Sequence, residues 1–277
     1  MRQRDSIGRA TFGWIAPRND IVPTERDIRW LTHIERHGPL SSEDLIAWTS
    51  DTHRCKDTGL RRLQALRAAG LVYLPKQQRH CARAEFRPYV YDLTIKGKTY
   101  LADRGLAEHA LRPTGHWWHM FETARFTARV ELAAKSRGHR YLAAHELPGN
   151  TTKSIAIPIG RELLIPDQLF AIDYGGLFRA FMVEVDRGTE PIASSSARKS
   201  WTSALEIYAR AFEAGLPNKS YSLRAPIQVV WVLNTLSRRD AFQRLLASKG
   251  QQLARRVLVT GVDEPIPHAL LLAHPTQ

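Results

Sequence analysis

Three acidic residues in the second half of the chain have the types and spacing of a metal site. Asp167 stands in a Pro-Asp pair at the head of an apolar segment, while Glu184 and Asp186 end the apolar run FRAFMVEVD. In an extended strand, residues i and i+2 point to the same face, so Glu184 and Asp186 should aim into one volume. A hairpin across residues 174–176 would bring Asp167 to them. Converging carboxylates stay ionised only beside a hard cation or a basic side chain, so the pattern predicts a divalent metal site.

The ordinary alternative is that these acids pair with Arg187 or Arg198 and bind no metal. Around them, the hydrophobic pattern predicts short strands and three amphipathic helices in alternation. The helices are expected near residues 116–138, 193–214 and 241–256, and the later strands near residues 227–235 and 257–261. This order describes an α/β (α+β) domain, a mixed sheet with helices on its faces.

The helix expected from His116 carries a second group of candidate ligands. His116, His119 and Glu122 follow one another at steps of three, so neighbours in the series share a face. His119 and Glu122 are therefore secondary site candidates. The alternative is that they form the polar side of a helix whose Trp117 and Phe121 are buried.

The first part of the chain has a different organisation. Residues 1–23 are a basic arm, and helices are expected from Thr24, from Ser41 and over residues 53–69. Two strands joined by a basic turn follow, and a polar passage at residues 106–115 marks the boundary, giving domains 24–110 and 111–277.

Three helices, the third of them basic, followed by a hairpin with a positive tip, resemble a winged helix-turn-helix. In that fold the third helix lies in the major groove and the wing touches the backbone. By this resemblance the DNA-binding candidates are, on the helix, Arg54, Lys56, Arg61 and Arg62, and, on the wing, Arg79 and Arg83. The collective basic face is the stronger prediction, because single members of such a set are often plain surface charges.

Composition agrees with a nucleic-acid partner. The 277 residues carry 40 Lys and Arg against 27 acids, a formal charge of +13, which favours polyanions. Cys55 and Cys81, with their neighbouring histidines, have no usual zinc spacing, so ordinary helix and wing roles are expected. No secretory signal or membrane-spanning run is recognisable, so we expect a soluble, cytoplasmic protein.

The Pro-Asp pair followed by Glu-x-Asp, after a long helix, resembles the core of PD-(D/E)xK restriction-endonuclease-like proteins. More narrowly, the segment EVDRGTE with Lys199 and Tyr208, behind a winged helix, is similar to the plasmid replication-relaxation family, which is related to nuclease-fold mobilisation relaxases. The resemblance implies Mg²⁺ or Mn²⁺ held by Asp167 and Glu184.

One position departs from the motif that the resemblance implies. The usual motif has lysine two residues after the glutamate, where this chain has Asp186. Either the lysine's role has moved to Lys199 on the following helix, or Asp186 is an extra ligand, or cleavage is lost. The catalytic candidates are therefore Asp167, Glu184, Asp186 and Lys199, and Tyr208 is expected in the core.

Two classes of function follow, with enzyme activity left open between them. The first is a metal-dependent endonuclease that nicks or processes DNA in plasmid or mobile-element replication or mobilisation. The second is a catalytically inactive relaxosome or replication accessory, or a transcriptional regulator, that binds DNA through the winged helix. Double-stranded DNA is the expected partner in both, other relaxosome or replication proteins and a second copy of the chain are further candidates, and no membrane is expected.

Overall fold

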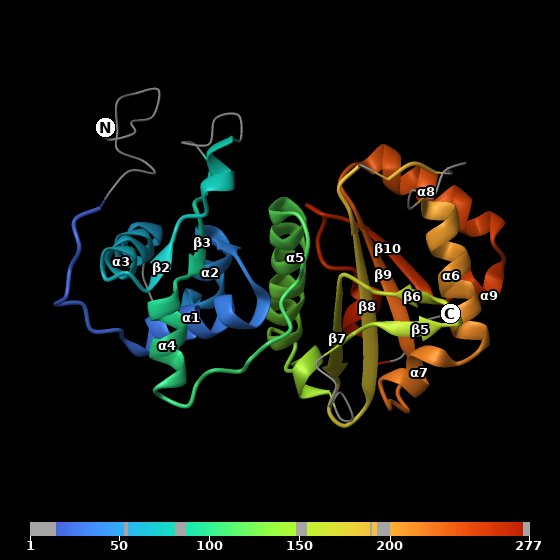
Figure 1. Cartoon of the computed structure of the whole chain (residues 1–277), viewed down its shortest axis with the longest axis horizontal. Helices are drawn as coiled ribbons and strands as arrows, with labels where there is room; N and C mark the ends of the chain where they lie inside the picture. Colours follow the sequence, from blue (N-terminus) through green and yellow to red (C-terminus); the bar gives the residue numbers. More distant parts are fainter. Residues whose placement is uncertain are drawn as a thin grey trace. The chain divides into compact units, whose positions relative to one another are not determined.

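A computed structural model shows a mixed α/β protein whose chain divides into two compact units, Met1–Ala128 and Arg129–Gln277 (Figure 1). The structure describes residues 15–52, 55–80, 87–147, 154–188, 190–192 and 200–273. The division falls inside helix α5 (Trp117–Lys135). The two units are described separately.

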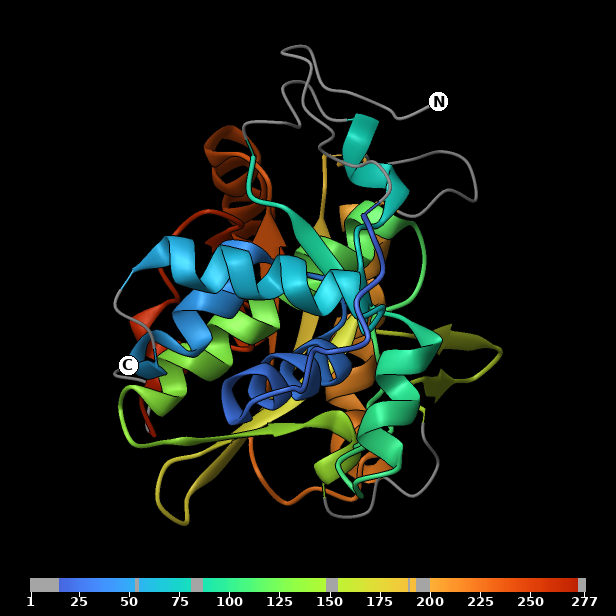
Figure 2. The same ribbon diagram turned by 90° about the vertical axis from the view of Figure 1, so that its left-hand side faces the viewer.

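The first unit contains helices, single-turn helices and a small sheet. Its α-helices before α5 are α1 (Glu25–His37), α2 (Ser42–Trp48), α3 (Lys56–Ala68) and α4 (Ile95–Ala102). Its strands are β1 (Leu40–Ser41), β2 (Val72–Tyr73) and β3 (Val90–Leu93), and its 3-10 turns are η1 (Ser50–Thr52) and η2 (Lys76–His80). The strands form an antiparallel sheet in the order β1-β3-β2. Figure 2 draws the helices of this unit, coloured blue to green, from a second direction.

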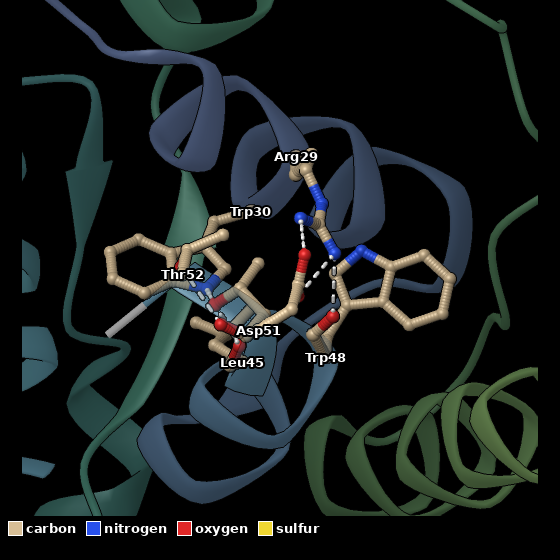
Figure 3. A network of polar contacts seen from close by, with 7 residues as sticks. Arg29, Trp30, Leu45, Trp48, Asp51 and Thr52 are labelled. Atoms are coloured by element: carbon tan, nitrogen blue, oxygen red, sulfur yellow. Dashed lines mark hydrogen bonds and ion pairs between the residues drawn. The ribbon is translucent and has the colours of Figure 1, made fainter. Parts of the chain in front are cut away.

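Local capping signals define where the first two helices begin. Thr24 and Asp27 form a capping box at α1, and Ser41 and Asp44 form another at α2, as the sequence predicted. A polar network then ties α1 to α2 (Figure 3). The indole N–H of Trp30 donates to the Leu45 carbonyl at 2.6 Å and to the Thr49 hydroxyl at 2.8 Å. Both helices are thereby fixed beneath α3.

Helix α3 packs two of its three leucines into the core of the first unit. Leu63 and Leu66 are buried, but Leu60 is only half-buried. The reason is Gly59, which lies so close to Ile46 that an added Cβ would be 2.9 Å from that side chain. The approach at Gly59 defines the inward face, and Leu60 lies about 100° away around the helix.

The second unit is built on a five-stranded mixed sheet, in the order β10-β9-β8-β7-β4. Its strands are β4 (Arg140–Ala143), β7 (Gln168–Asp173), β8 (Phe178–Asp186), β9 (Ile227–Leu233) and β10 (Val257–Gly261), with a separate hairpin of β5 (Ile157–Ile159) and β6 (Glu162–Leu164). Strands β4, β7 and β8 are antiparallel neighbours, whereas β8, β9 and β10 are parallel. Strands β8 and β9 are buried along nearly their whole length, as expected where helices cover the faces of a parallel sheet.

The crossovers between the parallel strands supply the helices. Helices α6 (Trp201–Glu213) and α7 (Leu216–Ser220) connect β8 to β9, and α8 (Leu236–Ser248) and α9 (Gln251–Ala254) connect β9 to β10; η4 (Ala144–Glu146) and η5 (His268–Leu271) complete the unit. Helices α6 and α8 lie on the same face of the sheet (Figure 1). The single helix expected over residues 241–256 is wrong, because Gly250 has φ +97° and interrupts it between α8 and α9.

The hairpin that was expected to bring the acids together is present. Strands β7 and β8 pair antiparallel with Asp173 opposite Phe178. Gly175 and Gly176 in the turn both have positive φ, and their N–H groups donate to the Asp173 carboxylate at 3.0 and 2.6 Å.

Among the described residues, no helix combines the length and the apolar composition that crossing a bilayer requires.

Candidate active site

Asp167 and Glu184 come together where the β7–β8 ladder ends. The last paired residues are Gln168 and Val183. One residue further, the N–H of Asp167 donates to the Val183 carbonyl at 2.9 Å, and its carboxylate accepts the N–H of Val185 at 2.7 Å. Asp167 therefore contacts the β8 backbone on both sides of Glu184, once through its own N–H and once through its carboxylate.

The two acids differ in exposure. Glu184 is 3% exposed, whereas Asp167 is half-buried. Strand β8 lies between β9 and β7, so the Glu184 side chain points to one face of the sheet, and that face is covered. Asp167 precedes its strand and keeps access to solvent. A ligand arriving from solution would meet Asp167 first.

Tyr208 on α6 contacts Glu184 directly. Its hydroxyl donates to Glu184 Oε1 at 2.6 Å, and the tyrosine is fully buried. Burial, followed by the negative charges of Glu184 and Asp167, raises the pKa of the Tyr208 hydroxyl well above its ordinary value. The hydroxyl therefore stays protonated and acts as a donor. Tyr208 lies in the core as expected, but its polar end belongs to the site.

Asp186 lies on the same strand face as Glu184 but has a different environment. Its carboxylate accepts the Trp201 indole N–H at 2.7 Å and the Gly188 backbone N–H at 2.7 Å, and it forms an ion pair with Arg238. Arg238 stacks over the Trp201 ring at 4.4 Å and also donates to the Glu190 carbonyl. These contacts join the end of β8 to the first turns of α6 and α8.

Some of the sequence candidates cannot be placed. Lys199, Arg54 and Arg83 lie outside the described residues, as does Arg198. The ion-pair alternative is partly realised, since Asp186 has an arginine partner. That partner is Arg238. The sequence offered no signal for Arg238, which lies in the first turn of a helix beyond the next strand.

The secondary candidates His119 and Glu122 belong to the first half of α5. Both are half-buried, and Glu122 lies 3.7 Å from Arg125 in an i,i+3 ion pair. Glu122 lines a pocket of about 200 Å³ in the first unit, together with Trp118, Phe121, Arg87 and Glu43. His119 is not among the residues that line it. The pocket therefore offers no His119–Glu122 ligand pair.

The described basic candidates of the first unit fall into two groups. Arg61 is exposed, and Lys56 is exposed with an ion pair to Glu43 at 3.1 Å. Arg62, expected to point outward, instead donates to Asp27 at 2.6 Å, and Asp27 is fully buried. Arg79 in η2 is half-buried. The solvent-facing charge of α3 is therefore carried by Lys56 and Arg61 rather than by Arg62.

Comparison with known proteins adds one decisive match. The sequence model of the family described as replication-relaxation matches residues 31–224, more than half of the chain. The chain belongs to the replication-relaxation family. No curated protein and no solved structure matches it significantly. Membership of the replication-relaxation family suggests a role in the replication or mobilisation of a plasmid or another mobile element. The matched region includes α3, Asp167, Glu184 and Tyr208.

Proposed function

We propose that this replication-relaxation protein binds double-stranded DNA and nicks or processes it at a metal-dependent, nuclease-like site in its second unit. The observation that carries the proposal is the meeting of Asp167 and Glu184 at the end of the β7–β8 ladder. The order of elements gives further support. A long helix precedes an antiparallel run β4-β7-β8, and α6 then leads to the parallel strand β9. The PD-(D/E)xK resemblance places its acids at the same two points, before one strand and within the next.

The donor atoms suit Mg²⁺ or Mn²⁺. Both are hard cations that prefer carboxylate oxygens, and Asp167 and Glu184 supply these from adjacent strands. Such an ion would polarise the scissile phosphate and lower the pKa of an attacking water. The chain's own contribution is to hold the two carboxylates: Val185 N–H binds one and Tyr208 binds the other. Lys199 remains the proposed cation that stabilises charge in the transition state.

The first unit supports the DNA-binding part of the proposal. Its order of three helices and a β-hairpin, with β1 completing the sheet, fits a winged helix-turn-helix. Helix α3 would then enter the major groove, with Lys56 and Arg61 on its solvent side. Arg79, at the start of the hairpin connection, is the described wing candidate. Other relaxosome or replication proteins, and a second copy of the chain, are further proposed partners.

A supercoiled-plasmid assay tests the enzymatic part. With Mg²⁺ or Mn²⁺ the parent protein should convert supercoiled plasmid to the open circle, and Asp167→Asn and Glu184→Gln should abolish this. Glu206→Gln is the matched control, since Glu206 lies exposed on α6 and pairs with Lys249. DNA affinity, measured by fluorescence anisotropy, should stay the same in all four proteins. An inactive parent that still binds DNA would overturn the nuclease proposal.

The alternative is an inactive accessory protein that binds DNA and uses the second unit as a scaffold. One observation favours it: position 186, where the resemblance expects a lysine, holds an aspartate that is tied to Trp201 and Arg238. A network of this kind fixes helices to a strand and performs no chemistry itself. The same plasmid assay separates the two proposals, because the accessory leaves plasmid supercoiled with every metal while retaining DNA affinity.

A further inference from the structure

Two buried tyrosines lie near Glu184, and their hydroxyl groups donate to different acceptors. Tyr208 donates its hydroxyl to Glu184 Oε1 at 2.6 Å. Tyr221, which is 1% exposed, donates its hydroxyl to the Ile155 carbonyl at 2.7 Å. The two residues therefore have the same chemistry and nearly the same burial but different acceptors. This pair separates an effect on Glu184 from the general cost of losing a buried hydroxyl.

The Tyr208 ring has little freedom to move. It lies edge-on to Trp231 with the ring centroids 6.0 Å apart and is stacked with Phe212 at 6.3 Å. Trp231 is on β9, directly across the parallel ladder from Glu184. Glu184, which accepts the hydrogen bond, and Trp231, which packs against the Tyr208 ring, are therefore neighbours in one sheet. Their spacing is fixed by backbone hydrogen bonds rather than by side-chain rotamers.

Helix α6 itself is fixed to the same strand. Ser200 caps its first turn, and the Trp201 indole binds Asp186. Tyr208 follows Trp201 by seven residues, about two helical turns, so both side chains project from one face of α6. The helix thus contacts β8 at two points, Asp186 and Glu184. Movement of the Tyr208 hydroxyl away from Glu184 would require the helix to break the contact at Asp186 as well.

We infer that Tyr208 is a positioning residue for Glu184, holding one carboxylate oxygen so that the carboxylate presents a fixed orientation to a divalent cation. The terminal torsion of a glutamate is broad and weakly restrained on its own. A short hydrogen bond from an immobile donor removes that freedom. Partners of this kind typically change metal affinity by about 10- to 100-fold when they are removed. The inference rests on the proposed function, because it takes Glu184 to be a metal ligand.

The test compares Tyr208→Phe with Tyr221→Phe in the full chain. Mn²⁺ binding is measured by calorimetry and by the electron paramagnetic resonance spectrum of the bound ion. We expect the Mn²⁺ dissociation constant to rise by about 10- to 100-fold in Tyr208→Phe and to stay within about twofold of the parent in Tyr221→Phe. In the plasmid assay, Tyr208→Phe should need more Mn²⁺ for half-maximal nicking but recover most of the parent rate at saturating metal.

Each other outcome has a definite meaning. Equal Mn²⁺ affinity in the parent and Tyr208→Phe would overturn the positioning role, and so would equal losses in both tyrosine variants, which would indicate general loosening. Thermal unfolding of the two variants checks that their stabilities are similar. A parent that binds no Mn²⁺ would overturn the proposed metal site itself. If the parent binds Mn²⁺ but does not nick the plasmid, the proposed activity is wrong, and the positioning role of Tyr208 is still supported by the difference in Mn²⁺ affinity.

Discussion

Replacing Asp186 with asparagine should destabilise the second unit without removing the proposed metal site. The Asp186 side chain is 1% exposed and receives hydrogen bonds from Trp201, Gly188 and Arg238. Asparagine has the same shape, but its amide nitrogen is a donor and would face one of these donors. The substitution also removes the negative charge opposite Arg238, whose side chain is 24% exposed.

The size of the effect follows from this geometry. Removing one partner of a fully buried ion pair costs about 3 to 5 kcal/mol, because the remaining charge is left unpaired. Arg238 keeps partial access to water and keeps its bond to the Glu190 carbonyl, which offsets some of that loss. We therefore expect a loss of about 3 kcal/mol, at the low end of the range. Hydrogen-exchange mass spectrometry measures this loss of stability in the second unit alone, through the free energy of exchange of the β8 amides.

Asp173→Asn is the matched control, since the Asp173 carboxylate accepts two backbone N–H groups in the exposed turn of the same sheet. Asparagine retains an acceptor there, so the loss should stay below about 1 kcal/mol. Equal losses in the two variants would refute the reasoning about the buried pair. Mn²⁺ affinity of the folded Asp186→Asn protein should match the parent. A large drop in that affinity would make Asp186 a ligand.

Three further predictions concern other parts of the chain. Lys56→Ala and Arg61→Ala should each weaken DNA binding and reduce the slope of log affinity against log salt by about 0.9, measured by anisotropy. Arg62→Ala should lower the melting temperature of the first unit, because fully buried Asp27 loses its ion-pair partner and keeps only its hydrogen bonds from Thr24. Burial raises the pKa of Tyr174 from 10.0 to about 12. The folded state thus favours the protonated phenol, so stability should be complete below pH 10 and fall towards pH 12, as tyrosinate absorbance during denaturation would show.

Much of the arrangement of Asp167, Glu184 and Asp186 could be predicted from the sequence because it is local. A strand alternates its side chains, so Glu184 and Asp186 share a face wherever the strand lies. Residues 174–176 supply the turn, because two adjacent glycines accept positive φ. The position of Asp167 beside the end of β8 follows once the two segments pair as a hairpin. None of these steps requires knowledge of the remaining chain.

The partners of those acids could not be predicted in the same way. Arg238 reaches Asp186 only because α8 crosses back over the sheet from β9. The partner of Arg62 was equally hidden in the sequence. Arg62 belongs to a basic helix and was expected to point outward, but it pairs with Asp27 on α1. A sequence shows that a charge is present, but its neutralisation depends on which elements become neighbours. Among the described candidates on α3, Arg62 is paired with Asp27, whereas Lys56 and Arg61 are exposed.

The contrast between the two acids of β8 bears on where a cation would bind. An arginine partner supplies a full positive charge, so the contact with Arg238 offsets the charge of Asp186. A tyrosine hydroxyl supplies only a dipole, and the raised pKa of Tyr208 keeps it a neutral donor. That contact orients Glu184 without cancelling its charge, and Asp167 adds a second negative charge beside it. Of the two positions on this strand face, the one at Glu184 is where a divalent cation would gain the more favourable electrostatic energy.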